Sequence, residues 1–326
     1  MAKRKTTPKR KARSKSRKKK TFKRSLINAI SGLAILVLVV VFAGLLAHFL
    51  IEPEKPSKTA ALPKSVPAVK HPIAKIPPME VYPPEEILPE KKPLKPPSTP
   101  AIEQLPLVAI IIDDLGYDEK IAEKLSELKT VLTFSILPYS PFQKIIARIA
   151  QDKGFETILH LPMEPNEYPS VNPGPGTLLT SMTPDQLIRQ LEKNLDAVPF
   201  IKGVNNHMGS KMTTESSHMY QIFSILKKRN LFFVDSRTTS KTLCKPSARL
   251  FQIPFAQRDV FLDHRQEEQF IRKQLKKLVQ IAQRHGHAIG IGHPHSLTYK
   301  VLREMLPEVQ REVQLVPVSK IVQLVG

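Results

Sequence analysis

The sequence predicts an α/β domain built on a parallel sheet, and three observations support this prediction. Residues 107–112 are six consecutive apolar, mostly β-branched residues, as in a strand buried on both faces. Strand patterns and amphipathic helix patterns then alternate to the end of the chain. Several strands end at Asp or His, where parallel α/β folds place their functional sites. The alternation is typical of a parallel barrel or an open parallel sheet.

The charge of the chain is concentrated at its N-terminus. Residues 1–24 hold 14 of the 50 Lys and Arg residues and no acidic residue. Residues 106–326 hold 28 basic and 22 acidic residues, a net charge of +6 against +21 for the whole chain. The domain is only mildly basic, so we expect no nucleic-acid partner. The single cysteine, Cys244, excludes an internal disulfide.

Residues 26–51 form an uncharged, mostly apolar stretch of 26 residues. As a helix it would span about 39 Å, enough to cross a lipid bilayer. We expect an uncleaved signal anchor over 25–51 rather than a cleaved signal peptide, because the stretch exceeds a signal-peptide core and no clear cleavage site follows. The basic tail, residues 1–24, is then cytoplasmic, and the C-terminal domain is periplasmic or otherwise extracytoplasmic. This describes a single-pass protein of the inner (cytoplasmic) membrane.

Residues 52–105 are rich in proline, with Pro-Pro pairs at 77–78, 83–84 and 96–97 and interleaved Lys and Glu. Such a composition favours an extended polyproline II spacer over a packed core. At about 3.1 Å per residue, the spacer reaches on the order of 150 Å. We expect a linker that holds the domain of residues 106–326 away from the membrane.

The expected elements follow the apolar patterns along the domain. Strands are expected at 107–112, 131–137, 156–161, 203–206, 231–235, 259–263, 287–292 and 314–318. Helices are expected at 118–128, 140–150, from 183 onwards, 217–228, 267–284 and 297–306. A Gly- and Pro-rich loop is expected at 162–180.

Turn and capping residues set several of these boundaries. Gly116 allows a sharp turn after the first strand, and Pro138 ends the second. Ser140 and Pro141 are a cap and a first-turn proline for the following helix. Residues 183–186 (TPDQ) are a capping box, and the helix they open places leucines 187, 191 and 195 on one face.

The strand ends carry residues that can bind a metal or move a proton. They are Asp113, Asp114, His160, His207, Asp235, Asp263, His293 and His295. Parallel connections bring all these ends to one face of the domain. A single such residue is more simply a helix cap, a turn residue or a core histidine. Five separate strand ends are hard to explain in that way.

Two His and one carboxylate with an open position form a hydrolytic metal site. Zinc is the expected ion, although iron and other divalent cations suit the same ligands. Asp113 and Asp114 are adjacent and point to opposite sides of a regular strand, so one would bind the metal and the other act on water or orient a neighbour. The HLPME sequence at 160–164 is not the HExxH of a zincin protease, and no phosphate loop or GxSxG elbow is present.

Five motifs in order, IIIDDLG, ILHLPMEP, NNHMGS, FFVDSRT and GIGHPH, resemble those of the NodB-type polysaccharide deacetylases. They most resemble the divergent polysaccharide deacetylase branch, the YibQ-like envelope proteins, over residues 107–318. The resemblance implies an irregular (β/α)7-type barrel of about seven strands. It also implies that Asp113 is the catalytic base, that Asp114 and His160 bind the metal, and that His293 helps the amine to leave.

The sequence departs from the family pattern at several positions. The second metal His, four residues after the first, is Glu164 here, so we expect His207 to replace it, with Glu164 as the weaker candidate. The family's Arg-x-Pro and Asp-x-Asp-Trp motifs are missing, and the chain has no Trp. Residues expected to support the site or contact substrate are Glu164, Asp235, Arg237, Asp263 and His295.

Two functions are compatible with these residues. The first is a membrane-anchored, metal-dependent carbohydrate N-deacetylase, a hydrolase of C–N bonds other than peptide bonds. It would remove acetyl groups from an N-acetylated envelope polysaccharide such as peptidoglycan, with Asp113 as base and His293 or His295 as proton donor. The alternative is a catalytically inactive module that binds glycan or an envelope protein. The missing motifs favour the alternative, because a fold does not by itself imply an activity.

Overall fold

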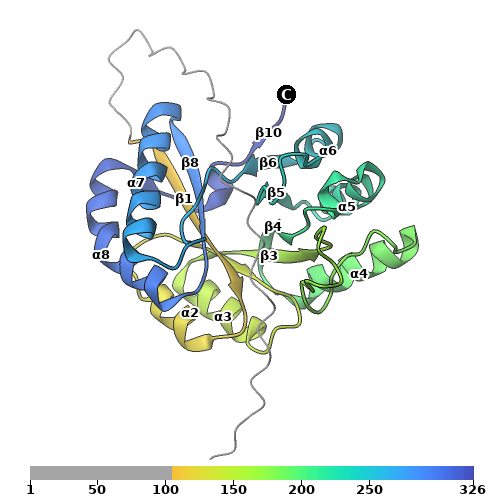
Figure 1. Cartoon of the computed structure of the whole chain (residues 1–326), viewed down its shortest axis with the longest axis horizontal. Coiled ribbons are helices and arrows are strands. Elements are labelled where there is room, and N and C mark those ends of the chain that lie inside the picture. The colour runs from red at the N-terminus through yellow and green to blue at the C-terminus, as the bar shows by residue number, and fades with distance from the viewer. Residues whose placement is uncertain (1–104) are drawn as a thin grey trace, which may run out of the picture. The chain divides into compact units, whose positions relative to one another are not determined.

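The structure is a computed structural model, and it describes residues 105–326 (Figure 1). The predicted basic tail, the predicted signal anchor and residues 52–104 of the predicted linker lie outside the described residues. Between residues 105 and 326, no helix has both the length and the apolar character that a bilayer crossing requires.

Within residues 105–326, ten strands form one sheet with the spatial order β10-β6-β5-β4-β3-β2-β1-β8-β7, and β9 pairs with β1. All neighbouring strands are parallel except β10 and β6. The strands are β1 (Leu107–Leu115), β2 (Thr133–Ile136), β3 (Glu156–Met163), β4 (Ile201–Met208), β5 (Phe232–Asp235), β6 (Pro254–Gln257), β7 (Val260–Phe261), β8 (His287–Gly292), β9 (Gln314–Leu315) and β10 (Gln323–Leu324). The predicted parallel α/β class is confirmed.

The sheet is an open half-barrel, which corrects the expectation of a barrel of about seven strands. Its hydrogen-bonded path ends at β7 and β10, and within residues 105–326 no strand pairing joins these ends. Strands β6 and β7 run in the same direction but are separated only by Arg258 and Asp259. A crossover between neighbouring parallel strands needs a dozen or more residues. These two strands therefore cannot lie side by side; β10 pairs with the other edge of β6, and the barrel opens between β7 and β10.

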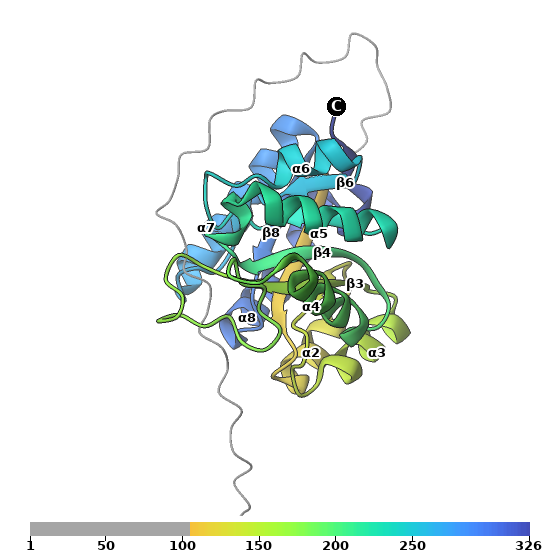
Figure 2. The same ribbon diagram turned by 90° about the vertical axis from the view of Figure 1, so that its right-hand side faces the viewer.

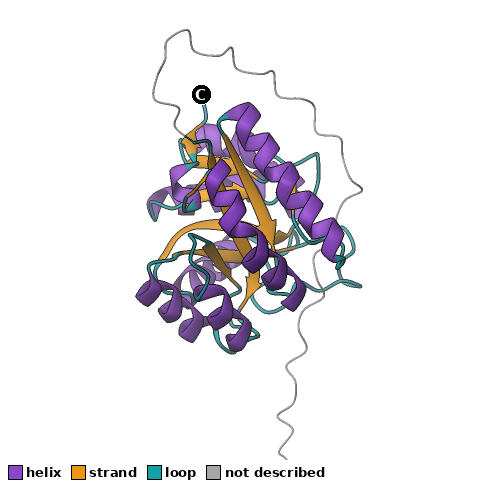
Figure 3. Ribbon diagram, turned by 90° about the vertical axis from the view of Figure 1, so that its left-hand side faces the viewer, coloured by secondary structure: helices purple, strands orange, loops and turns teal. Residues whose placement is uncertain are grey.

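Helices cover the outer side of the sheet (Figure 3). They are α2 (Glu119–Ser126), α3 (Gln143–Lys153), α4 (Pro184–Ala197), α5 (Ser216–Lys228), α6 (Cys244–Phe251), α7 (Glu268–His285) and α8 (Ser296–Glu312), with 3-10 turns at Met212–Thr214 and Val318–Lys320. Helices α4, α5 and α6 follow one another along the side formed by β3 to β6 (Figure 2).

Capping residues account for several helix boundaries. The predicted capping box of α4 is present: Thr183 Oγ1 accepts a hydrogen bond from Gln186 N, and Gln186 Oε1 accepts one from Thr183 N. The expected cap at Ser140 is wrong, because its hydroxyl donates to Leu137 O and α3 begins at Gln143. Gly116 adopts φ +139°, and a Cβ there would lie 1.9 Å from Ser140 Oγ, so glycine is required at this turn.

Alternation along the strands separates two hydrophobic layers. Val108, Ile110 and Ile112 of β1 pack toward the helices, whereas Ala109 and Ile111 belong to a smaller cluster made of strand residues and the C-terminal segment. The smaller cluster fills the inner side of the half-barrel. Ile158 of β3, Val234 of β5, and Ile289 and Ile291 of β8 share this inner side. Residues that continue these inward rows at the strand ends must meet in one place.

A bulge changes the expected alternation at the end of β1. The pairing of β1 with β2 shifts register between Ile112 and Leu115. Asp114, inside this shift, adopts a left-handed conformation with φ 54°. A bulge re-aims the side chain that it carries. The adjacent Asp113 and Asp114 therefore reach the same histidine, instead of pointing to opposite sides as a regular strand would require.

Candidate metal centre

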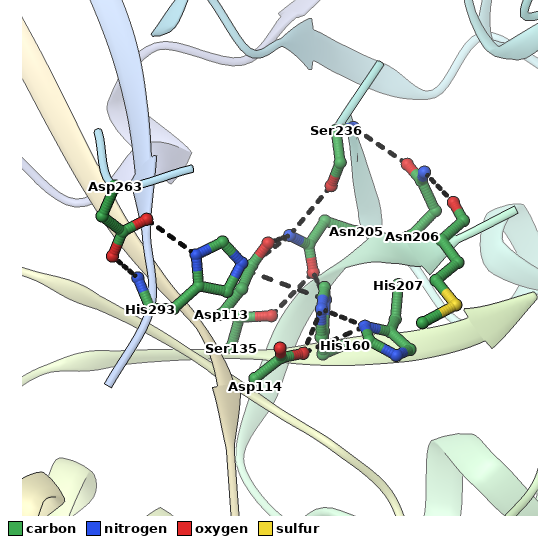
Figure 4. A network of polar contacts seen from close by, with 11 residues as sticks. Asp113, Asp114, Ser135, His160, Asn205, Asn206, His207, Ser236, Asp263 and His293 are labelled. Carbon is green, nitrogen blue, oxygen red and sulfur yellow. Dashed lines mark hydrogen bonds and ion pairs between the residues drawn. The ribbon is translucent and has the colours of Figure 1, made fainter. Parts of the chain in front are cut away.

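Asp114, His160 and His207 form a compact triangle of metal-ligand atoms (Figure 4). Oδ1 of Asp114 lies 3.1 Å from Nε2 of His160 and 3.0 Å from Nδ1 of His207. The two nitrogens are 3.1 Å apart. Both imidazoles are buried, and the Asp114 side chain is 13% exposed. The residues lie at or near the C-terminal ends of β1, β3 and β4, so one edge of the sheet assembles the triangle.

The triangle fits a divalent cation. The spacing of the three ligand atoms, 3.0 to 3.1 Å, suits the usual Zn–N and Zn–O distances of about 2.1 Å. Oδ1 of Asp114 is buried and faces both imidazole nitrogens, so a cation held between the three atoms would satisfy it. Burial acts to raise the pKa of the Asp114 carboxyl, but His207 and His160 outweigh this and hold that pKa well below its usual value. An ionised carboxylate with two imidazoles is a donor set for zinc and similar ions.

Asp113 lies next to the triangle and is not one of its three ligands. Its carboxylate is fully buried, and Oδ1 lies 3.8 Å from Nδ1 of His160. Both of its oxygens accept a hydrogen bond from Nδ2 of Asn205, at 2.8 and 3.0 Å. Asp113 and Asp114 thus face the two different nitrogens of the same imidazole.

His293 at the end of β8 forms a buried pair with Asp263, which follows β7. Nδ1 of His293 lies 2.8 Å from Asp263 Oδ1, and the His293 backbone N–H donates to Oδ2 at 2.6 Å. Thr298 Oγ1 also donates to Oδ2, at 2.7 Å. Burial acts to raise the pKa of Asp263, but His293 and the Thr298 hydroxyl hold it below its usual value. The His293 ring points toward Asp113 (Figure 4).

His295 lies close to His293, with 6.1 Å between the ring centroids. Its Nε2 is buried and has no hydrogen-bond partner in the described part of the chain. Burial lowers the pKa of this imidazole below its usual value, so the ring is neutral at pH 7. His295 also occupies the N-cap position of α8, which fixes its backbone.

The structure does not bring Glu164, Asp235 and Arg237 into the triangle. Glu164 accepts hydrogen bonds from Lys211 Nζ, at 2.7 Å, and from Thr180 N. Burial acts to raise the pKa of Glu164, but these two partners hold it below its usual value. This carboxylate is therefore tied to the loop that follows β3, and the second histidine of the triangle is His207.

Asp235 lies two residues after Phe233 on β5, and Phe233 packs toward the helices. By strand alternation, Asp235 faces the same outer side. Its Oδ1 accepts a hydrogen bond from Arg237 N at 2.8 Å, and burial raises the pKa of its carboxyl. The Arg237 guanidinium donates to Gln257 Oε1 at 3.3 Å. Both residues therefore shape the loop after β5.

Asn205 is the residue of the site that the sequence analysis missed. It is fully buried on β4, two residues before His207, so both side chains project to the inner side. Besides its bonds to Asp113, its Oδ1 accepts a hydrogen bond from Ser135 Oγ at 2.7 Å and lies 2.9 Å from His160 Nδ1. The spacing to His207 was the signal that could have identified it.

The chain belongs to the divergent polysaccharide deacetylase family, whose sequence model matches residues 110–322. The matched range contains the triangle, Asp113, Asn205 and the Asp263–His293 pair. This confirms the family resemblance that the five motifs predicted.

Relatives of the chain are known in bacteria. The uncharacterised protein YibQ of Escherichia coli is 34% identical over 214 residues, 66% of either chain, so the match spans about two thirds of that relative. An uncharacterised protein of Haemophilus influenzae is 31% identical over 64% of this chain and 74% of its own. The crystal structure of the uncharacterised protein ATU2773 from Agrobacterium tumefaciens superimposes with a TM-score of 0.65 and 28% identity, over 69% of this chain and 92% of that one.

Proposed function

We propose that the domain is a metal-dependent carbohydrate N-deacetylase, which removes acetyl groups from an N-acetylated polysaccharide. The observation that carries this proposal is the meeting of two groups at neighbouring strand ends. One is the Asp114–His160–His207 triangle, and the other is the Asp263–His293 pair. Amide hydrolysis needs both an electrophilic centre and a proton donor for the departing nitrogen.

Asp114, His160 and His207 would hold one divalent cation, for which we propose zinc. A divalent cation in such a site lowers the pKa of water and polarises the carbonyl under attack. Asp113 would accept the proton that the attacking water loses, because it is the carboxylate next to the triangle that is not a ligand. Its contact with Asn205 holds it in position.

His293 would donate the proton that the departing amine needs. Asp263 accepts from the Nδ1 side of the ring, so the proton given to the amine would come from Nε2 of the imidazolium form. As the acetyl C–N bond breaks, the carbonyl carbon keeps the oxygen of water, and the sugar nitrogen takes the proton from His293. The products would be acetate and a free amino sugar.

The location and the substrate of the enzyme are parts of the same proposal. The uncharged stretch at 26–51, preceded by 14 basic residues, favours a signal anchor in the inner membrane with the domain outside the cytoplasm. The Pro-rich linker would give the domain reach toward the cell-envelope glycan, with peptidoglycan as the candidate substrate. The bilayer is then a partner through residues 26–51.

Metal analysis and acetate release test the proposal together. The purified full-length chain should contain about one divalent cation per molecule, the stoichiometry of a single three-ligand site. It should release acetate from cell-wall glycan, and chelation should abolish this release. Asp113→Asn is the matched control, because it should keep the metal and lose the activity. A metal-free, chelator-insensitive wild type would contradict the proposal.

The second candidate is a catalytically inactive module that binds glycan or an envelope protein. The full burial of Asp113 favours it, because a general base must reach the water that it activates. Metal-loaded wild-type protein that binds glycan or an envelope protein but releases no acetate would support this candidate.

A further inference from the structure

The orientation of the Asn205 amide follows from its neighbours. The NH2 group of Asn205 faces Asp113, and both carboxyl oxygens of Asp113 accept from it. Nδ2 lies 2.8 and 3.0 Å from the two oxygens of Asp113. The amide oxygen then faces the opposite way, where Ser135 Oγ and His160 Nδ1 lie at 2.7 and 2.9 Å.

This orientation decides which nitrogen of His160 carries the proton. The amide oxygen of Asn205 is only an acceptor, so Nδ1 of His160 must be the donor. The neutral ring then keeps its lone pair on Nε2. This is the nitrogen that lies 3.1 Å from both Asp114 Oδ1 and His207 Nδ1. The lone pair therefore points to the position that a cation would take.

We propose that Asn205 is a positioning residue that fixes the tautomer of His160 and anchors Asp113 with the same amide. It joins a metal ligand to the proposed base without adding a charge between them. The role rests on the proposed function in one respect, namely that the triangle binds a cation. The Asn205 contact favours Nδ1–H in the metal-free protein, where the Asp114 carboxylate, 3.1 Å from Nε2, is the competing acceptor.

Asn206 provides a matched control on the same strand. It is also a fully buried asparagine, but its amide donates to Met208 O at 2.8 Å and accepts from Ser236 N at 2.9 Å. These are backbone groups, and none belongs to His160 or Asp113. Asn206→Ala therefore removes an equally buried amide from β4 without removing a bond to the proposed machinery.

The first test records the tautomer of His160 by 15N NMR. The full-length, metal-free chain is labelled only at histidine and studied at alkaline pH, where the ring is neutral. The His160 signals are those lost in His160→Gln. We expect the Nδ1–H form in the wild type and in Asn206→Ala, and appearance of the Nε2–H form in Asn205→Ala. Asn205→Asp keeps an acceptor for Nδ1–H and should keep the wild-type tautomer. An Nε2–H form in the wild type would overturn the inference, even if Asn205→Ala fails to fold.

The second test measures zinc affinity by competition with a chromophoric chelator. Removing the hydrogen-bond partner of a metal-binding histidine weakens metal affinity by about 10–100-fold, and we expect this loss in Asn205→Ala. Asn206→Ala should stay within about threefold of the wild type, because it leaves that partner in place. An equal loss in the two variants would reduce Asn205 to a structural role. A wild type that binds no zinc would contradict the proposed function, whereas the tautomer result would still decide the role of Asn205.

Discussion

Asp263 holds His293 by the side chain and the backbone at once. Oδ1 lies 2.8 Å from the imidazole Nδ1, and Oδ2 accepts the backbone N–H at 2.6 Å. The backbone contact fixes the end of β8, and the contact with Nδ1 fixes the orientation of the His293 ring. This pairing keeps the proton on Nδ1 and directs Nε2 away from Asp263.

Asp263→Asn should therefore lower deacetylase turnover by about 10²–10⁴-fold, the usual contribution of an acid–base group, and leave the metal content unchanged. The amide that replaces the carboxylate can present its NH2 group to Nδ1 and so impose the wrong tautomer. Acetate release per bound metal measures the effect.

Asp259→Asn is the control for this variant. Asp259 also accepts a backbone N–H of β8, that of Ile289 at 2.9 Å. Asp259→Asn should therefore affect stability more than turnover. Equal turnover losses in the two variants would mean that Asp263 supports the strand rather than the proton donor.

His160→Ala should abolish metal binding, because it removes one of the three ligand atoms and leaves only Asp114 and His207. Asp113→Asn should retain the metal, because Asp113 is not one of the three ligands. Elemental analysis of the two purified variants separates the roles. Loss of metal in Asp113→Asn would place this carboxylate among the ligands and contradict its assignment as the base.

The inward rows of the strands explain how far the sequence predicted this site. His160 follows Ile158, and His293 follows Ile289 and Ile291, and all three apolar residues lie in the inner cluster. Strand alternation therefore places both histidines on the same side. Asp235 also ends a strand, but it follows Phe233 of the outer layer, so it lies outside the triangle. Strand ends alone did not distinguish these two cases.

The bulge at Asp114, the end of α8 and helix α6 could not be predicted from the hydrophobic pattern. The shift of register next to Asp114 brings both carboxylates to His160, and a bulge leaves no periodic signal. The expected end of the last helix at residue 306 is wrong, because α8 continues through Pro307 to Glu312. Helix α6 was not expected from the sequence; its Pro246 lies in the first helical turn, where proline is tolerated.

Asp235→Asn should stabilise the domain at neutral pH. Burial raises the pKa of this carboxyl in the folded state, so its stabilising contribution is complete below the unfolded pKa of about 3.9 and is lost as the pH rises through the folded pKa. The variant does not titrate. Its free energy of unfolding should exceed that of the wild type by about 1.4 kcal/mol for each unit by which folding raises the pKa of Asp235. Urea denaturation at several pH values measures the difference.

Asp263→Asn is the control of opposite sign. The folded pKa of Asp263 is lowered, so its contribution is present above the unfolded pKa and is lost as the pH falls through the folded pKa. This variant should be less stable than the wild type at neutral pH, and the difference should shrink in acid. A pH-independent difference for Asp235→Asn would show that burial does not raise that pKa.

A reporter enzyme that is active only outside the cytoplasm should be active when fused after Thr99. The fusion keeps the 14 positive charges of residues 1–24 and the uncharged stretch at 26–51, which together predict a cytoplasmic N-terminus. A matched fusion after Arg24 lacks the uncharged stretch and should be inactive. Activity of a cytoplasm-only reporter after Thr99 would overturn the topology and the proposed envelope substrate with it.

His293→Ala separates the enzyme from the binding module. If His293 donates the proton to the departing amine, its removal should lower turnover by about 10²–10⁴-fold, as expected for a lost general acid. Metal content should stay unchanged, because His293 is outside the triangle.

His295→Ala is the paired variant. Burial lowers the pKa of the His295 ring, so the ring is neutral at pH 7, and the substitution should reduce turnover less than His293→Ala. If the domain only binds, neither the wild type nor either variant releases acetate, and the variants change only the affinity for glycan or a protein partner. Equal, nonzero turnover in the wild type and His293→Ala would remove His293 as the proton donor and would also exclude a domain that only binds.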